Sequence, residues 1–386
     1  MAGARAMFFT YFAYVGLMGP YFGLWLESAG LSIVQIGLLL SVPPWLRIVA
    51  PPCWGWLADR TGRQVGLLRI SAVSSLALVL MLPWVREMPA LVAWLLCLGF
   101  MSSAQGPIGE ALALKQSSGE PGRYGRIRLW GSVGYIVTVT LGGWVLDRAG
   151  VHTLPWMMAC GLAGFLLVTL LMRDPPAAAR MDAVRASLGR RLREPAVLAF
   201  LASAFLMVFA HGALYAFWSI YLERQGYSRT AIGLIWALGV LAEIALFAWQ
   251  RALFERFDAM RVLQLSFVVC ALRFALIGWS DSAPWGLVLG TQLLHAITFG
   301  AHHSASMAVM HRWFDASQQA RAQAAFIVVA YGLGGGLGAV VAGWLWTHVS
   351  PGGAFLGSAV AAMLGLAAIS LATRMPWGSR PQQRQA

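Results

Sequence analysis

Ionisable side chains occur in the middle of long apolar stretches of this 386-residue chain. They are Arg47, Glu110, Arg128, Glu243 and Arg273, with the histidines His211, His295, His302 and His303. A charged side chain at the centre of a lipid bilayer costs about 2.5–3.5 kcal/mol on insertion scales, so it needs a partner, a cavity or a function. As a set, they predict a pathway for a substrate or for protons. For any one of them, a buried pair or a snorkelling side chain is the alternative.

The arginines in this set predict an anionic substrate. A guanidinium is a planar fork that pairs a carboxylate through two hydrogen bonds, and Arg47, Arg128 and Arg273 supply such groups. The aromatic side chains that would hold a ring in the same cavity are Tyr11, Tyr14, Tyr215, Trp218 and Tyr331. Trp and Tyr are also common at membrane interfaces and in ordinary helix packing, which is the alternative for these residues.

Three of the histidines lie on one predicted helix. His295 and His302 are seven residues apart and share a face, whereas His303 points about 100° away. No carboxylate or thiolate joins them there, so the sequence predicts no metal site and no cofactor. Because histidine titrates near physiological pH, these residues indicate a proton relay or hydrogen bonds to a polar substrate.

The elements that carry these residues are predicted to be membrane-spanning helices. Hydrophobic residues make up 59% of the chain and charged residues 11%, whereas a soluble domain carries about 25% charged residues. Apolar windows of about 20 residues predict an all-α membrane protein with twelve transmembrane helices. The predicted spans are 6–26, 33–58, 65–84, 88–114, 127–146, 152–172, 196–222, 230–250, 261–279, 285–310, 322–346 and 352–372.

A long polar segment after the sixth span divides the chain into two six-helix bundles. The predicted parts are an N-terminal bundle at 1–172, a linker at 173–194, a C-terminal bundle at 195–374 and a tail at 375–386. Most of the 28 Lys and Arg residues lie on the side of the chain termini, so the positive-inside rule predicts that the termini and the linker are cytoplasmic. The net charge of +13 is thus a topology signal, not a sign of nucleic-acid binding.

The two halves repeat one another. Residues 26–38 align with residues 222–234 at an offset of 196 residues (222 − 26), and seven of these thirteen positions are identical. At the same offset Arg47 aligns with Glu243, and Asp59-Arg60 aligns with Glu255-Arg256. The pattern predicts two parallel pseudo-repeats, which is a known plan of secondary transporters.

The loop after the second span carries a specific motif. Its sequence Gly55-Trp56-Leu57-Ala58-Asp59-Arg60-Thr61-Gly62-Arg63 resembles the Gly-x-Leu-x-Asp-Arg-x-Gly-Arg signature of the major facilitator superfamily. The resemblance covers the whole chain and implies two bundles around a central cavity that faces each side of the membrane in turn. It implies a gate formed by Asp59, Arg60 and Arg63, with Asp59 against the start of span eleven. By the repeat, Glu255 and Arg256 would join the gate, with Glu255 against span five.

Shorter stretches resemble one branch of that superfamily, the lactose-permease-like proton symporters and the bacterial 3-phenylpropionate transporters. These stretches are Pro107 with Glu110 and Lys115, residues 11–14, 36–40, 124–132, 239–243 and 270–273, and His295 with 298–299 and His302. The resemblance implies that Glu110 and Arg128 bind substrate and that Arg273 and His295 serve proton coupling. The permease glutamate three residues after the histidine is Thr298 here. We therefore predict that Glu243 carries the proton, paired with Arg273.

The predicted function is proton-coupled symport of a small organic acid of the phenylpropionate type across the bacterial inner membrane. The predicted transporter is a monomer, and its partners are the substrate, protons and the lipid bilayer. The substrate-binding prediction comprises Glu110, Arg128, Arg47, Tyr14, His211, Tyr215, Trp218 and Tyr331. The proton-coupling prediction comprises Glu243, Arg273, His295 and His302. Sugar or nucleoside symport, drug–proton antiport and a non-transporting sensor or scaffold are the alternatives. An enzyme is not predicted, because no Gly-x-Ser-x-Gly, His-Glu-x-x-His or phosphate-binding glycine loop is present.

Overall fold

The structure is a computed structural model that describes residues 2–117, 120–174, 189–280, 282 and 284–375. The first half contains α1 (Ala2–Ser28), α2 (Ile33–Leu46), α3 (Ala50–Thr61), α4 (Gln64–Met81), η1 (Leu82–Trp84), α5 (Met88–Ser102), α6 (Gln105–Gln116), α7 (Pro121–Ala149), η2 (Val151–Thr153) and α8 (Leu154–Leu171). The second half contains α9 (Gly189–Leu192), α10 (Pro195–Ala210), α11 (Gly212–Arg224), α12 (Arg229–Arg256), α13 (Ala259–Trp279), α14 (Trp285–Leu293), η3 (Ala296–Ala301), α15 (His302–Trp313), α16 (Ala316–Phe326), η4 (Ile327–Gly334), α17 (Gly335–His348) and α18 (Pro351–Arg374).

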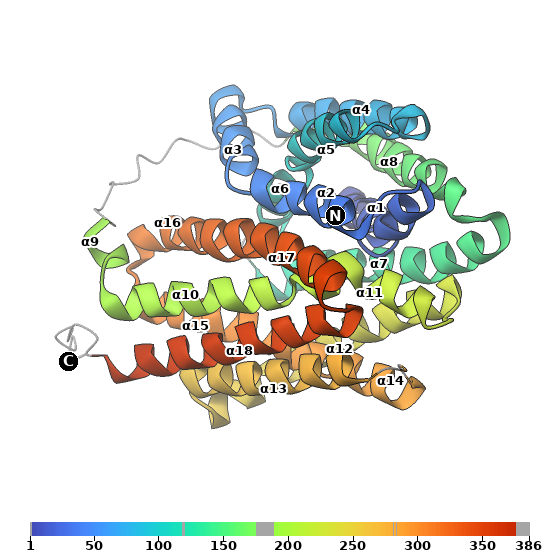
Figure 1. Cartoon of the computed structure of the whole chain (residues 1–386). Helices are drawn as coiled ribbons and strands as arrows, with labels where there is room; N and C mark the ends of the chain where they lie inside the picture. Colours follow the sequence, from blue (N-terminus) through green and yellow to red (C-terminus); the bar gives the residue numbers. More distant parts are fainter. Residues whose placement is uncertain (1, 118–119, 175–188, 281, 283, 376–386) are drawn as a thin grey trace.

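These helices confirm the predicted all-α membrane fold of twelve transmembrane helices. Ten helical segments of the described chain are long and apolar enough to cross a membrane. The other two long segments are α1 and the continuous run from α14 to α15, whose tyrosines and histidines make them less apolar. In Figure 1, α1–α8 occupy the upper part of the molecule and α10–α18 the lower part.

Several spans predicted as single helices are interrupted. The span predicted at 33–58 consists of α2 and α3, separated by a turn at residues 47–49. Pro43, Pro44, Pro51 and Pro52 surround this turn, and proline removes a backbone donor and clashes with the preceding helical turn. The spans predicted at 88–114 and 196–222 are likewise broken, into α5–α6 and α10–α11.

Two further spans contain π-helical turns. The span predicted at 285–310 includes η3, and the span predicted at 322–346 begins earlier, at Ala316, and includes η4. Such i→i+5 turns are rare and occur mostly at functional sites. Here they interrupt the two helices that carry His295, His302 and Tyr331.

The repeat is visible in the backbone. Gly30 and Gly226, which lie 196 residues apart, both adopt a positive φ, of 89° and 85°. Ser32 and Ser228, at the same offset, cap α2 and α12 by accepting hydrogen bonds from the backbone N–H groups of Gln35 and Ala231. The bounds of the predicted parts stay a prediction, because residues 175–188 and 376–386 lie outside the described residues.

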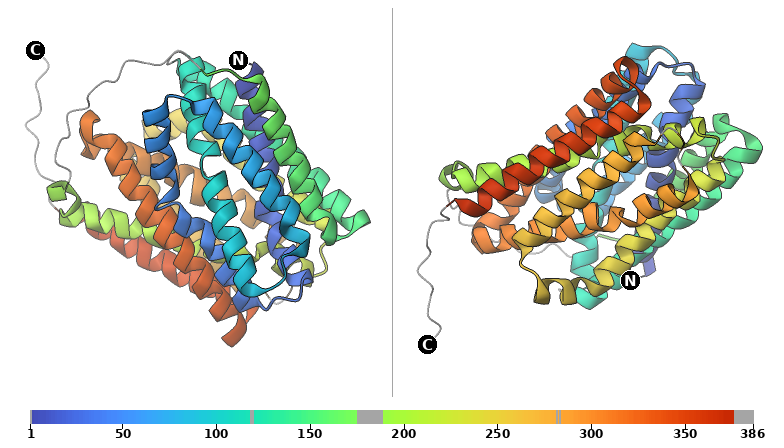
Figure 2. Two further views of the ribbon diagram at one scale, coloured as in Figure 1. Left: turned by 90° about the horizontal axis from the view of Figure 1, so that it is seen from above. Right: turned by 60° about the horizontal axis from the view of Figure 1, so that its bottom comes forward.

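The two halves meet mainly near one end of the molecule. We call the end at which α1 begins and α18 ends the terminal end, and the opposite end, at which α1 ends and α12 begins, the distal end. The tightest packing between the halves joins α2 to α17, α7 to α12 and α1 to α11, and it lies in the distal portions of these helices. Figure 2 shows the two halves side by side.

Glycines permit this close approach between α7 and α12. A Cβ atom at Gly233 of α12 would lie 2.3 Å from the carbonyl oxygen of Val139, and one at Gly143 of α7 would lie 2.2 Å from that of Arg229. Small residues allow helix backbones to come this near in a membrane protein. The structure is therefore closed at the distal end.

Candidate functional site: a central charged cluster

The first-half part of the cluster is a loosely paired arginine and glutamate. Arg128 of α7 lies with its guanidinium 4.4 Å from the ring centre of Phe12 and 5.5 Å from that of Phe8, both on α1. Its Nε lies 4.0 Å from Glu110 Oε1, and the two side chains are 35% and 50% exposed. The structure thus brings these two predicted residues together while leaving the guanidinium accessible to an anion.

Arg47 extends the cluster across the two halves. It lies at the break between α2 and α3, and its guanidinium is 5.7 Å from the ring centre of Tyr331 in η4. The Tyr331 hydroxyl is 3.3 Å from Nδ1 of His303. The proline-rich break and the π-helical turn therefore place an arginine and a tyrosine of opposite halves against one another.

A buried chain of polar groups forms the second-half part of the cluster. His295 Nε2 lies 3.0 Å from Glu243 Oε1, and His295 Nδ1 lies 2.9 Å from Arg273 Nη1. The direct Glu243–Arg273 pair that we predicted is absent among the described ion pairs, since the imidazole stands between the two groups. The charge of Glu243 also interacts with Tyr135 and Arg128 on α7, which connects it to the first-half residues.

The partners of His295 determine where its protons lie. A guanidinium can only donate hydrogen bonds, so Nδ1 of His295 accepts from Arg273. The ring proton is therefore on Nε2, which donates to Glu243. A second proton on His295 would place two donors against each other at Nδ1, so this geometry keeps the imidazole neutral.

Thr298 and His211 continue the chain. Arg273 Nη1 donates to Thr298 Oγ1 at 3.2 Å, and Thr298 Oγ1 lies 3.4 Å from His211 Nε2. His211 Nδ1 donates to the carbonyl oxygen of Met207, so Nε2 is an acceptor. The Thr298 hydroxyl has two acceptors within reach, His211 Nε2 and the carbonyl oxygen of His295 at 3.3 Å. Arg273 is fully buried, and its Nε and Nη2 bond to no described residue.

His302 belongs to a separate contact. Its Nδ1 lies 3.1 Å from the hydroxyl of Ser266, which itself donates to the carbonyl of Leu263. Its Nε2 has no partner among the described residues. No group of three or more His, Cys, Asp and Glu in the described part of the chain could hold a metal ion.

Aromatic residues form one wall of this cluster. Tyr215 is 41% exposed, and its ring centre lies 6.3 Å from both Phe299 and Trp236. Phe299 stacks on His295 with ring centres 5.4 Å apart. The sequence did not lead us to assign Phe299 or Tyr135 to the site, because an aromatic residue on an apolar helix gives no sign of which way it faces.

Two predicted binding residues lie elsewhere. Tyr14 is buried in the first half against Gly161 of α8. Trp218 is buried in the second half, where it stacks on Tyr221 and meets the edge of Phe355. The structure does not bring either one to the charged cluster.

The predicted gate residues lie at the terminal end. Asp59 and Arg60 are exposed near the end of α3, and the Arg60 guanidinium lies 5.3 Å from the Trp56 ring centre, while Arg63 precedes α4. Glu255 pairs with Arg251 on its own helix, and no ion pair or hydrogen bond joins it to the described residues of α7. The predicted gate would form when the terminal end is closed, whereas the structure is closed at the distal end. The roles of these residues therefore stay predictions, namely those of Asp59, Arg60, Arg63, Glu255 and Arg256.

Polar contacts of Asp147 and Glu27 join the two halves at the distal end, and the sequence did not lead us to predict them. We call these contacts the polar lock. The carboxylate of Asp147, at the end of α7, accepts hydrogen bonds from the backbone N–H groups of Arg229 and Thr230, each at 2.8 Å. It thereby caps α12 of the other half. Arg224 Nη2 also lies 2.7 Å from Glu27 Oε1 across the halves. The sequence contained one sign of this lock, namely a few charged residues at an otherwise charge-poor end.

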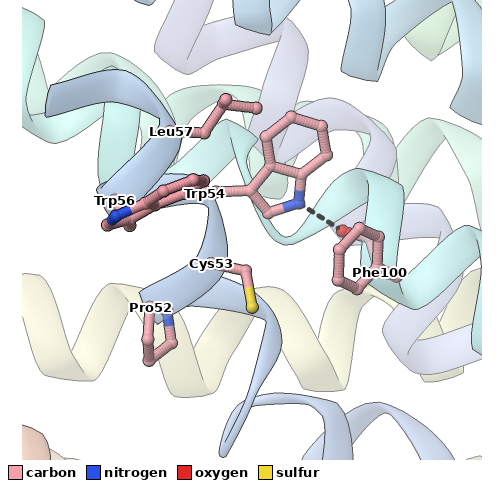
Figure 3. Close-up of a pocket in the computed structure, with 6 residues that line it drawn as sticks. All are labelled: Pro52, Cys53, Trp54, Trp56, Leu57 and Phe100. Carbon is pink, nitrogen blue, oxygen red and sulfur yellow. Dashed lines mark hydrogen bonds between the residues drawn. The ribbon is translucent and has the colours of Figure 1, made fainter. Parts of the chain in front are cut away.

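The structure also has an apolar cavity of about 440 Å³ between α3 and α5 (Figure 3). Cys53, Trp56 and Phe100 are among the residues that line it, and Trp54 Nε1 donates to the carbonyl oxygen of Phe100 at 2.8 Å. None of the charged residues of the cluster lines this cavity. It therefore does not form part of the charged site.

A family model described as the MFS_1 like family matches residues 4–357. The chain belongs to this family. This MFS_1-like chain is 31% identical over 360 residues to the probable 3-phenylpropionic acid transporter of Escherichia coli (strain K12). The alignment covers 89% of this chain and 91% of that protein.

Other relatives of this MFS_1-like protein have different names. The maltose permease of Geobacillus stearothermophilus is 28% identical over 369 residues, covering 94% of this chain and 92% of that protein. The crystal structure of the nucleoside transporter NupG superposes with a TM-score of 0.83 at 17% identity, over 97% of this chain and 99% of that one. Together with the twelve helices, these matches identify a multi-pass membrane transporter rather than an enzyme.

Proposed function

We propose that this MFS_1-like transporter is a proton-coupled symporter that imports a small aromatic acid across a bacterial inner membrane by alternating access. The observation that carries the proposal is the buried chain of Glu243, His295 and Arg273, whose carboxylate also senses the charge of Arg128 in the first half. The 31% identity to a relative named as a probable 3-phenylpropionic acid transporter supports the substrate class.

In this proposal the substrate carboxylate binds Arg47 and Arg128. Arg128 is held flat against Phe12, and Glu110 is too distant at 4.0 Å to use the whole fork of the guanidinium. The substrate ring packs on Tyr215 and Phe299 of the second half, and Tyr331 of the same half lies beside Arg47. Substrate would therefore contact both halves at once, which is what a transporter needs if binding is to control their relative position.

The proton would be carried by Glu243. When Glu243 is ionised, its charge balances that of Arg273 through the neutral imidazole of His295. When Glu243 is protonated, the positive charge of Arg273 has no such counter-charge, and the site attracts an anion more strongly. Proton binding and anion binding therefore favour one another, and by linkage this coupling is reciprocal.

We further propose that the distal end faces the periplasm, in agreement with the excess of Lys and Arg at the terminal end. The described state is closed at the distal end by the Asp147 cap and by the approach of Gly233 to Val139. In this orientation the state corresponds to a transporter closed to the periplasm.

Uptake into liposomes tests this function. Purified protein reconstituted with an inward proton gradient should accumulate radiolabelled 3-phenylpropionate, and a protonophore should abolish the accumulation. One elementary charge crossing 100 mV supplies about 2.3 kcal/mol for such work. Uptake of 3-phenylpropionate that does not respond to the protonophore would contradict proton coupling.

Sugar symport is the second candidate, because the maltose permease relative is 28% identical over nearly the same length. In that case Glu110 and Arg128 would bind hydroxyl groups rather than a carboxylate. The same liposomes should be offered maltose and a nucleoside. Gradient-driven accumulation of either one without 3-phenylpropionate uptake would replace the aromatic-acid proposal.

A further inference from the structure

A second cavity lies at the terminal end of the second half, and none of the residues of the central charged cluster lines it. It has a volume of about 440 Å³ and lies among the ends of α13, α15 and α18. Its lining includes Asp258, Met260, Arg261, Arg312, Trp313 and Ala372. No transport role assigned above uses any of these side chains.

The cavity carries a net positive charge. Asp258 Oδ1 pairs with Arg312 Nη1 at 2.9 Å, and Asp258 Oδ2 accepts from the backbone N–H of Met260 at 2.8 Å. Partial burial acts to raise the pKa of Asp258, but these two hydrogen bonds outweigh it and hold the pKa below its ordinary value, so Asp258 is ionised at neutral pH. One carboxylate thus faces two guanidiniums.

Arg261 is the guanidinium that lies near Asp258 but is not hydrogen-bonded to it. Its side chain is exposed, it lines the cavity, and no hydrogen bond joins it to any other residue that the structure describes. Both oxygens of Asp258 are already engaged by Arg312 and Met260. Arg261 therefore has its donors available for an anion.

The position of the cavity indicates a ligand in the membrane. Arg261 is in the first turn of the membrane-crossing helix α13, and Ala372 is in the last turn of α18, which packs along α13. These residues lie at the depth where a membrane helix leaves the hydrocarbon core and meets the headgroups. Met260, Trp313 and Ala372 add an apolar wall beside the guanidinium.

We propose that this cavity binds the headgroup of an anionic phospholipid, with the phosphate on Arg261 and the start of an acyl chain on the Met260–Ala372 wall. Basic pockets between the ends of membrane helices recognise such headgroups. A soluble phosphate would use the guanidinium but would leave the apolar wall uncovered. The combination of both surfaces at the edge of the bilayer therefore favours the lipid.

Native mass spectrometry of the purified full-length protein in detergent tests the proposal, with phosphatidylglycerol added and phosphatidylcholine of the same acyl chains as the comparison. We expect phosphatidylglycerol to bind preferentially. Arg261→Gln should weaken its binding about tenfold, as expected for the loss of one charge-assisted hydrogen-bond partner. The matched control is Arg123→Gln, which removes an arginine at the same end of the other half.

Equal binding of phosphatidylglycerol to the wild type and to Arg261→Gln would overturn the proposal. Binding of sn-glycerol 1-phosphate or inorganic phosphate as tightly as the lipid would assign the cavity to a soluble anion, which also overturns it. Thermal unfolding of each variant identifies loss of folded protein, and in that case Arg261→Lys replaces Arg261→Gln. Lipid binding is read independently of transport, so failure of the proposed substrate leaves this test intact.

Discussion

The guanidinium of Arg128 lies over an aromatic ring, with its central carbon 4.4 Å from the ring centre of Phe12. Its ion pair with Glu110 is loose, because Nε is 4.0 Å from the nearest carboxylate oxygen. We predict that Arg128→Lys weakens binding of 3-phenylpropionate about tenfold or more although the charge is kept, since lysine has no planar fork. Ligand-induced thermal stabilisation measures this affinity. Arg123→Lys on the same helix is the control, and equal affinity of wild type and Arg128→Lys would remove Arg128 from the site.

Glu243 is mostly buried, with 16% of its side chain exposed, and its carboxylate accepts a hydrogen bond from His295. We predict that Glu243→Gln abolishes proton-driven accumulation but keeps the exchange of labelled for unlabelled substrate, because glutamine holds the hydrogen bond and cannot carry a proton. Counterflow and gradient-driven uptake in the same liposomes separate the two activities. If Glu243 served only to satisfy a buried charge, Glu243→Gln would lose folded protein and removal of Arg273 would restore it.

His295 offers a sharper test of which group moves the proton. Glutamine can accept from Arg273 through its oxygen and donate to Glu243 through its nitrogen, so it can replace both hydrogen bonds of the neutral imidazole. We predict that His295→Gln keeps proton-driven accumulation within a few-fold of the wild type and that His295→Leu abolishes it. If both variants are folded and both lose proton-driven accumulation, His295 itself is the proton carrier.

At the scale of the helices, the approach of α7 to α12 depends on Gly233, where an added Cβ would lie 2.3 Å from a backbone oxygen. We predict that Gly233→Val opens the distal end. The valine side chain would collide with the α7 backbone, which cannot move aside as a flexible side chain can. Spin labels at Arg86 and His348, in a background without the four native cysteines, would report a longer distance across that end.

Gly286 on α14 gives the matched control for this substitution, since nothing lies within 4 Å of a Cβ placed there. Gly286→Val carries the same change in helix propensity and should leave the label distance unchanged. An unchanged distance in Gly233→Val as well would mean that the α7–α12 contact does not hold the distal end closed.

The helices also show what the sequence could and could not predict. Local signals were sufficient for the caps at Ser32 and Ser228 and for the twelve spans, because capping and apolar length are properties of contiguous residues. The direction of Tyr14 and Trp218 was not accessible, because their helices are apolar on every side and periodicity cannot identify a cavity face. The Asp147 cap joins residues more than eighty positions apart, and no local pattern encodes it.

For the whole molecule, alternating access requires two closed states of similar free energy. The Asp147 cap is formed in the described distal-closed state, whereas the proposed Asp59 gate would act when the terminal end is closed. We predict that Asp147→Ala and Asp59→Asn shift the population in opposite directions, each by roughly 1 kcal/mol, which is about fivefold.

The same pair of spin labels reads both shifts, and the double variant should return close to the wild-type distribution. Additivity is expected because the two residues lie at opposite ends of the molecule. A shift in the same direction for both single variants would contradict the assignment of Asp59 to the opposing gate.

The π-helical turns at Ala296–Ala301 and Ile327–Gly334 have a consequence for how such states could interconvert. Each turn holds more residues than an α-helical turn of the same helix, so its conversion to α-helix would advance the register beyond it by one residue. One residue corresponds to a rotation of about 100° about the helix axis. Tyr331, which now meets Arg47, would swing to a different face of its helix without any hinge or tilt of the bundle. A screw motion of one register step is thus available to the two helices that carry Tyr331 and His295, to which we propose binding and coupling roles.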